Sequence, residues 1–355
     1  MSVRFQESDW RRIESDYTAW WKGELERPLL CISIGRPGVD WPYGRFMTNW
    51  PADMSDDELA DGAARVIASE FYLGDAFPTF FVNFGPGTAG AFTGATLRST
   101  PETVWFEPPE RHALEDITIR LDPENPWWRR VQHVTRVLAE RLGDRVAISS
   151  LDIGGNLDIL ASLRGSAELL MDLAGEPEEV RRLSRDVTRM WLEIYDTLHS
   201  LIAPHCRGMV DWARIWAPGR TYMFQSDMSY MISPEMFRDF VVPDLEACGE
   251  AIEWGFYHLD GPGQIVHLDH LCSIKSLKGI QWIPGAGNRP PAEWPEVLGK
   301  IREAGKLCQI RVTPQEAFDV IKRHGGKGFQ FRVSGGGLTP TTAAAFLRDA
   351  LEAAC

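Results

Sequence analysis

Short apolar runs alternate with helix-length segments from residue 77 onward, and this alternation constrains the fold more than any other feature of the chain. The runs begin near residues 78, 146, 208, 254, 278, 306 and 328. They are continuously apolar, which is typical of parallel strands covered by helices. The pattern predicts an α/β fold, and a single (β/α)₈ barrel is the most economical architecture for this length.

A closed barrel needs an eighth strand, which is either Leu29 to Ile34 or a segment without a clear strand pattern. The expected organisation is a helical and irregular extension over residues 1–70, packed on a barrel over residues 71–355. Apolar residues at helical spacing predict an amphipathic helix from Asp9 to Glu26, which Arg27-Pro28 ends. No GxGxxG follows a strand, and neither GxxxxGK[ST] nor an internal repeat occurs, which disfavours nucleotide-binding α/β folds.

Composition and charge narrow the classes of function. The chain has 355 residues, of which 44% are hydrophobic and 25% charged, as in globular proteins. A net charge of −13 and the lack of long Lys/Arg runs argue against nucleic-acid binding. No run of 18 apolar residues and no signal-peptide segment occur, so we expect no membrane span and a cytoplasmic location. The scattered cysteines predict free thiols.

One stretch, Trp254 to Asn288, carries two predicted strands that end in polar residues. His258 and Asp260 share one face of the first strand, because successive side chains of a strand alternate. Ligands bind at the carboxyl ends of strands in α/β proteins. We therefore expect His258 and Asp260 to be catalytic or metal-binding, and Gln281 and Trp282 to contact substrate. The alternative for the pair is a hydrogen bond that holds the strand end.

Acidic and polar residues mark other predicted strand ends. Asp152 precedes Gly154-Gly155 and is a candidate acid, base or ligand, with helix capping as its alternative. Asp158 lies inside the next helix and is expected to be structural. Tyr222 and Gln225 are expected to orient a polar ligand.

Four arginines fall at or just after predicted strand ends: Arg214, Arg220, Arg311 and Arg332. The segment GMVDWARIW is expected to be a strand in which Val210, Trp212 and Arg214 alternate with their neighbours. Two or more converging guanidinium groups would form an anion clamp, since their forks match carboxylate or phosphate. A single one is more often part of an ion pair.

Five segments carry a family resemblance through their order and spacing. They are Arg27-Pro28, IGGNLDILASLRG (Ile153 to Gly165), SDMSYMISPEMFRDFVVPDLEACGEAI (Ser226 to Ile252), GIQW (Gly279 to Trp282) and VSGGGLTPTT (Val333 to Thr342). With them the chain resembles the uroporphyrinogen decarboxylase superfamily, which includes the methylcobamide:coenzyme M methyltransferases. The resemblance implies a (β/α)₈ barrel, and it puts Asp227 where the family has the aspartate of D-S-W.

The departures from the family pattern argue against its best-known reaction. The decarboxylases carry an aspartate after the first barrel strand, where this chain has Asn83. Asn83 can contact a substrate but offers no negative charge. The family's closing histidine is replaced within Gly335 to Gly337, and its paired arginines have only Arg36 and Arg45 as counterparts. Porphyrinogen decarboxylation is therefore not expected.

The methyltransferase branch binds zinc through His-x-Cys and a later cysteine. This chain keeps the histidine as His258 but has Asp260 in place of the cysteine, and no cysteine near Ser334. The resemblance implies a divalent metal, zinc first, at His258 and Asp260. It also implies a corrinoid carried by a partner protein, and related barrel enzymes often pair as homodimers.

Three functions follow for a small polar or anionic substrate. The leading hypothesis is metal-assisted, corrinoid-linked methyl transfer. The second is a metal-independent lyase or decarboxylase in which His258 and Asp152 act as acid and base. The third is a binding protein that has lost catalytic groups.

Overall fold

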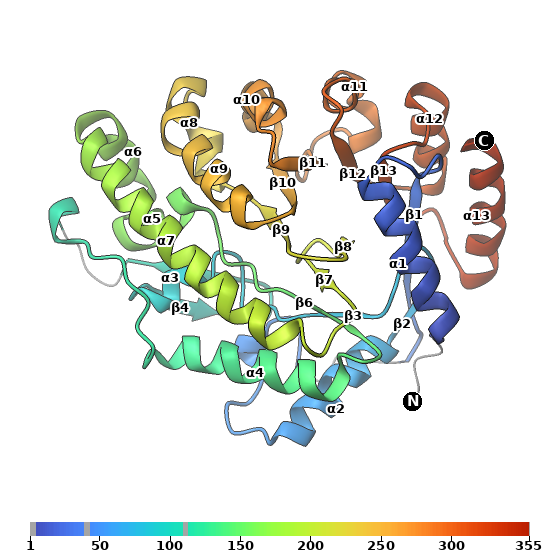
Figure 1. Ribbon diagram of the computed structural model, residues 1–355, viewed down its shortest axis with the longest axis horizontal. Coiled ribbons are helices and arrows are strands. Elements are labelled where there is room, and N and C mark those ends of the chain that lie inside the picture. Colours follow the sequence, from blue (N-terminus) through green and yellow to red (C-terminus); the bar gives the residue numbers. More distant parts are fainter. Residues whose placement is uncertain (1–4, 39–42, 109–112, 355) are drawn as a thin grey trace.

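The computed structural model describes residues 5–38, 43–108 and 113–354, which form an α/β fold with helices around mostly parallel strands (Figure 1). The strands are β1 Leu29–Gly35, β2 Glu70–Gly74, β3 Thr79–Phe81, β4 Thr96–Ser99, β5 Val104–Glu107, β6 Ala147–Ser149, β7 Met209–Val210, β8 Trp216–Ala217, β9 Thr221–Phe224, β10 Trp254–Asp260, β11 Leu277–Ile283, β12 Leu307–Val312 and β13 Phe329–Val333.

The helices alternate with these strands along the chain. They are α1 Glu7–Trp21, α2 Asp56–Ala68, α3 Ala89–Phe92, α4 Pro126–Leu142, α5 Asn156–Arg164, α6 Ser166–Gly175, α7 Pro177–Ile202, α8 Pro234–Phe240, α9 Val242–Ala251, α10 Leu268–Ser273, α11 Pro295–Glu303, α12 Pro314–His324 and α13 Pro340–Ala354. Short 3-10 helices are η1 Met47–Asn49, η2 Leu114–Asp116, η3 Asp227–Met231, η4 Pro262–His267 and η5 Pro291–Glu293.

Two sheets carry the main strands. The larger has the order β2-β1-β13-β12-β11-β10-β9, and its neighbours pair in parallel except β1 with β2. The smaller has the order β3-β6-β7-β8, with β7 and β8 antiparallel. β4 and β5 form a separate hairpin. The carboxyl ends of the parallel strands therefore meet at one edge.

The seven strands expected from the sequence are present as β3, β6, β7, β10, β11, β12 and β13. The candidate eighth strand is β1, which pairs in parallel with β13. This segment of the expected extension therefore belongs to the larger sheet, and Figure 1 shows the first and last parts of the chain side by side. β2 and β9 were not expected from the sequence.

Backbone hydrogen bonds among the described strands do not run in one closed ring, so they alone do not define a barrel. One interruption lies between β7 and β9. There the indole nitrogen of Trp212 donates to the carbonyl oxygen of Met223 at 3.0 Å. This side-chain hydrogen bond stands where backbone hydrogen bonds between β7 and β9 would be expected. The second interruption lies between β1 and β3.

α1 covers the amino-terminal ends of the strands. Its buried residues are Trp10, Ile13, Tyr17, Trp20 and Trp21. Trp20 stacks on Phe256 of β10 with ring centroids 5.9 Å apart, and the same apolar cluster includes Leu29 and Leu307, the first residues of β1 and β12. The carboxyl ends are thereby left for a site.

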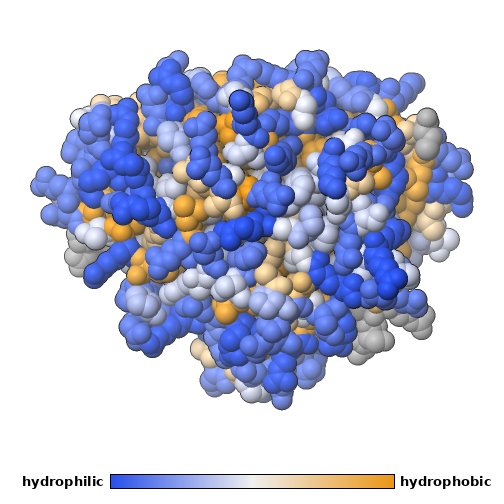
Figure 2. Space-filling model, viewed as in Figure 1, coloured by the Kyte–Doolittle hydropathy of each residue, from blue (hydrophilic) through white to orange (hydrophobic). Residues whose placement is uncertain are grey.

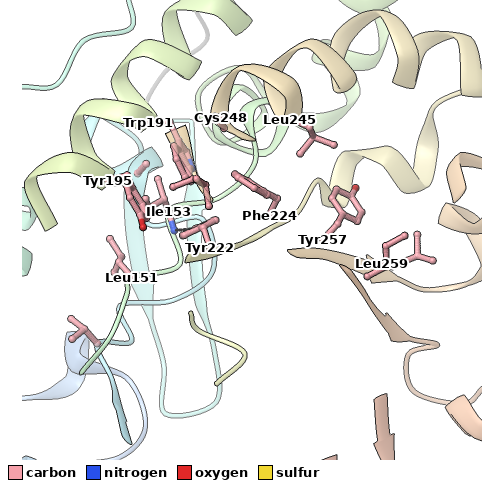
Figure 3. Packing of buried hydrophobic residues seen from close by; sticks show 14 of the residues in the cluster. Leu151, Ile153, Trp191, Tyr195, Tyr222, Phe224, Leu245, Cys248, Tyr257 and Leu259 are labelled. Carbon is pink, nitrogen blue, oxygen red and sulfur yellow. Dashed lines mark hydrogen bonds between the residues drawn. The ribbon is translucent and has the colours of Figure 1, made fainter. Parts of the chain in front are cut away.

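The larger apolar cluster lies between the strands and the outer helices. Trp191 of α7 meets Tyr222 of β9 edge to face, with ring centroids 4.7 Å apart (Figure 3). Hydrophilic residues cover most of the face in Figure 2. Within the described parts of the chain, no helix is both long and apolar enough to span a membrane.

Asp75, which follows β2, fastens the N-terminal segment to the sheet. Its buried carboxylate accepts hydrogen bonds from Arg12 at 2.9 Å, Arg27 at 2.7 and 3.1 Å, and the N–H of Leu30 at 2.7 Å. Arg27, part of one of the segments that resemble the family, is therefore an anchor of β1.

We expect Asp75→Ala to lower the free energy of unfolding by about 3 kcal/mol, because two guanidinium groups and a buried N–H lose their acceptor. Urea denaturation measures this change. Asp144→Ala is the control, since the Asp144 side chain is 74% exposed and forms a surface ion pair with Arg145. That control should lose less than about 1 kcal/mol. Equal losses of unfolding free energy in the two variants would show that the buried hydrogen bonds of Asp75 stabilise the fold no more than a surface ion pair does.

Candidate functional site

A pocket of about 730 Å³ opens at the carboxyl ends of the strands. Its wall comes from the ends of β3, β7, β12 and β13, from β2, and from loops after β1 and β4. Its polar and charged lining residues are Arg45, Glu70, Tyr72, Thr79, Asn83, Arg214, Arg311 and Arg332, and Trp50 and Trp212 add aromatic surface. The position is the usual one for ligands in α/β proteins.

Two arginines stand next to each other in this wall. Arg311 of β12 is directly opposite Arg332 of β13 in the parallel register. Arg332 donates from Nη1 to the carbonyl oxygen of Ala213 at 3.1 Å, whereas Arg311 has no hydrogen bond or ion pair with any described residue. Burial, together with repulsion from Arg214, lowers the pKa of Arg332 to about 10. Neither guanidinium group forms an ion pair with a carboxylate of the described residues, although the positive charge of Arg332 acts on the nearby Asp211 and favours its ionised form.

Arg214 reaches the same pocket from a strained loop. Among the described residues it is the one non-glycine with positive φ, at 65°. The loop is held by Asp211, whose Oδ1 accepts the N–H of Ile215 at 2.8 Å and whose carbonyl accepts the N–H of Arg214 at 3.0 Å. Nη1 of Arg214 lies 3.2 Å from Glu70. Backbone strain of this kind persists where its surroundings enforce it, often at functional sites.

The pocket gathers three of the four arginines expected to form a clamp. Arg220 is elsewhere, because it precedes β9 and so lies at the amino end of that strand. It pairs with Asp196 and donates to the carbonyl of Ala251 at 2.7 Å. Asn83 and Arg45 also line the pocket.

Three other predicted contacts lie outside the pocket wall. Tyr222 is fully buried, and its hydroxyl accepts the N–H of Ile153 at 2.8 Å. Trp282 is fully buried against Trp294, with ring centroids 5.2 Å apart. Gln281 is 2% exposed and turns toward His258.

His258 is not among the residues that line the pocket, but its ring lies against that of Trp212, which does line it, with ring centroids 5.2 Å apart. Its Nδ1 is hydrogen bonded to Oε1 of Gln281, and its Nε2 lies 3.9 Å from Oδ2 of Asp260. Burial lowers the pKa of His258, and Asp260 acts in the opposite direction. The imidazole is therefore neutral near pH 7, with a carboxylate close to Nε2.

The predicted aspartates lie around a second pocket of about 440 Å³, which Asp158, Asp227 and Gln225 line. Asp158 accepts the N–H groups of Asp227 and Met228 at 2.9 Å each, so it holds the start of η3. Asp152 lies beside them and lines neither pocket. Burial, with repulsion from Asp227 and Asp158, raises the pKa of Asp152 to about 8. Asp152 is therefore protonated at neutral pH and could only donate a proton there.

The residues present do not fit the zinc centre that the resemblance implied. Catalytic zinc usually has three protein ligands. His258 and Asp260 are two, and Nδ1 of His258 is occupied by Gln281. Across the described ranges no group of three or more His, Cys, Asp or Glu side chains could hold a metal ion.

Sequence reasoning missed Asp211 and Glu70. GMVDWARIW was expected to be one strand, but β7 ends at Val210 and Asp211 starts a turn. The available signal was the aspartate itself, because Asp side chains often bond the backbone just beyond them in turns. No sequence pattern marked Glu70 as a site residue, because its position at the pocket depends on the antiparallel pairing of β2 with β1.

The raised pKa of Asp152 predicts a pH dependence of stability. Its folded pKa of about 8 exceeds the usual 3.8, so the unfolded chain releases this proton at lower pH than the folded chain. The contribution of Asp152 to the free energy of unfolding should therefore fall between about pH 4 and about pH 8. Asp152→Asn cannot ionise and should fall less over that range in urea denaturation. Parallel curves for the two proteins would contradict the assignment.

Comparison with known proteins leaves the family open. No family model matches the chain, and no curated protein matches it. Among solved structures, a B12-independent methionine synthase from Shewanella sp. W3-18-1 in complex with selenomethionine aligns over 74% of each chain, at 10% identity and a TM-score of 0.39. A likeness this weak carries no argument about activity, so the resemblance to the uroporphyrinogen decarboxylase superfamily stays a prediction.

Proposed function

We propose that this protein is an enzyme that binds a small organic acid through Arg214, Arg311 and Arg332 and moves a proton with His258. The proposed reaction is of the lyase type and uses no metal. One observation carries the proposal. Arg311 and Arg332 stand side by side on neighbouring strands at a pocket, and within the described residues neither is paired with a carboxylate.

The charge of the pocket supports an anionic ligand. Like charges directly opposite each other destabilise a sheet. Among the described residues, four arginines and one glutamate line the pocket, although the whole chain has a net charge of −13. The glutamate, Glu70, forms its ion pair with Arg214. A bound carboxylate would relieve the repulsion between Arg311 and Arg332, and guanidinium forks match its geometry.

His258 suits the role of a base. It is neutral near pH 7, and Asp260 would stabilise its charged form after proton transfer. In the proposed step, Nε2 takes a proton from the carbon next to the substrate carboxylate. The C–H electron pair moves toward that carboxylate, where the arginines stabilise the charge. A leaving group on the adjacent carbon then departs with its bonding pair, and a C=C bond forms.

Metal-assisted methyl transfer from a corrinoid on a partner protein is the competing function. Its support is the distance of 3.9 Å between Nε2 of His258 and Oδ2 of Asp260, which would allow both to approach one ion. The missing third ligand counts against it. Zinc and the corrinoid partner thus remain predictions from the resemblance.

We expect malonate to bind the wild-type protein in calorimetric titration, and Arg311→Met and Arg332→Met each to weaken binding at least about tenfold. The reason is that each variant removes a charged hydrogen bond worth about 1.5–3 kcal/mol. Arg323→Met is the control, because Arg323 is exposed on α12 and lies outside the pocket wall.

Two further measurements distinguish the proposed function from a phosphate-ester substrate and from the metal-dependent function. If the protein bound inorganic phosphate and not malonate, the substrate would be a phosphate ester and not an organic acid. Dialysis against EDTA should leave malonate binding unchanged, and a loss that added zinc restores would favour the metal-dependent function. If both pocket variants bound malonate with wild-type affinity, the proposal that Arg311 and Arg332 bind an organic acid would be wrong.

A further inference from the structure

A buried row of polar side chains leads from His258 across the larger sheet. The register places His258 of β10 opposite Gln281 of β11, Gln281 opposite Gln309 of β12, and Gln309 opposite Gln330 of β13. Gln330 in turn donates to the hydroxyl of Tyr17 on α1 at 2.9 Å. We name these five residues the glutamine row.

Hydrogen bonds join every neighbouring pair in the glutamine row. Nε2 of Gln281 donates to Oε1 of Gln309, and Nε2 of Gln309 donates to Oε1 of Gln330. The three amides are 2%, 0% and 0% exposed in chain order. Burying an amide costs free energy unless its hydrogen bonds are made, so the row holds its shape as a unit.

Backbone carbonyls fix the direction of the row. Nε2 of Gln309 also lies 3.2 Å from the carbonyl oxygen of Ala213, which can only accept, so the nitrogen must face that way. At the far end, the hydroxyl of Tyr17 donates to the carbonyl of Asp75 at 3.2 Å and therefore accepts from Gln330. Both anchors require each amide to donate away from His258.

The direction of the row decides which nitrogen of His258 carries the proton. Gln281 has used its N–H group on Gln309, so it presents its oxygen to Nδ1 of His258. An oxygen acceptor requires Nδ1 to be the donor, and a neutral imidazole then has a bare Nε2. We infer that the glutamine row fixes His258 as the Nδ1-protonated tautomer, which leaves Nε2 free to accept a proton beside Asp260.

The opposite tautomer would require the whole row to turn. If Gln281 offered its nitrogen to His258, its oxygen would face the oxygen of Gln309. Turning Gln309 to match would place its oxygen 3.2 Å from the carbonyl of Ala213, where two acceptors repel each other. Gln309 is therefore a positioning residue that acts on His258 through Gln281. The use of Nε2 as a base rests on the proposed function, whereas the tautomer does not.

The test is the two-bond 15N–1H correlation spectrum of uniformly 15N-labelled protein without substrate, recorded above the pKa of His258. His258→Gln identifies the signals of that ring. We expect a protonated Nδ1 and a bare Nε2 in the wild type. Gln309→Met removes the anchor to Ala213 and should produce a mixture of both tautomers.

Gln264→Met is the matched control. Gln264 is 1% exposed, and its Nε2 donates to the carbonyl of Ser226 at 3.1 Å, outside the glutamine row. This variant should keep the wild-type spectrum of His258 even if it unfolds more easily. It separates loss of a buried amide in general from loss of the row.

A wild-type ring protonated at Nε2 would overturn the inference, and so would an unchanged tautomer in folded Gln309→Met. The wild-type spectrum is decisive by itself, so the inference stays testable if the variant fails to fold. The measurement needs no ligand. Absent malonate binding with the expected tautomer would defeat the proposed function alone, and the wrong tautomer with intact binding would defeat this inference alone.

Discussion

The carbonyl oxygen of Ala213 receives two hydrogen bonds on which the candidate site depends. One comes from Gln309 at 3.2 Å and the other from Arg332 at 3.1 Å. A carbonyl oxygen has two lone pairs, and both are used. One bond sets the direction of the row that reaches His258, and the other holds an arginine of the anion pocket. The parts of the candidate site that we propose for proton transfer and for anion binding thus share one acceptor.

The position of that carbonyl depends in turn on Asp211. This residue is fully buried, and its bonds to Ile215 and Arg214 close the loop that contains Ala213. Burial raises the pKa of Asp211 to about 7, so its negative charge is weakly held near neutral pH. The left-handed backbone at Arg214 adds a cost of about 1–3 kcal/mol. The loop is maintained against both costs, which is expected of a segment whose shape matters.

The sequence predicts a site residue where local sequence patterns fix its position, and it fails where the position depends on pairing between strands. Strand positions followed from continuous apolar runs, and Arg311 and Arg332 could be placed because each lies near the end of such a run. Arg220 was misplaced because the short strand β9 went unrecognised, so a residue before a strand was taken for one after it. The partnership of Gln281 with His258 depends on the register between β10 and β11, and no local pattern encodes that register.

Residue spacing along the strands explains why glutamine supports this site. Asp260, Arg311 and Arg332 each follow a member of the glutamine row by two positions, so they share its face and lie one level nearer the carboxyl ends. The sheet therefore has two levels of side chains: the charged residues Asp260, Arg311 and Arg332 lie nearer the carboxyl ends, and the neutral polar glutamine row lies beneath them. Acidic residues in the lower level could pair with the arginines and neutralise the anion pocket, and apolar residues could not direct His258. Amides donate and accept without charge, so they orient the imidazole and leave the guanidinium groups available to a ligand.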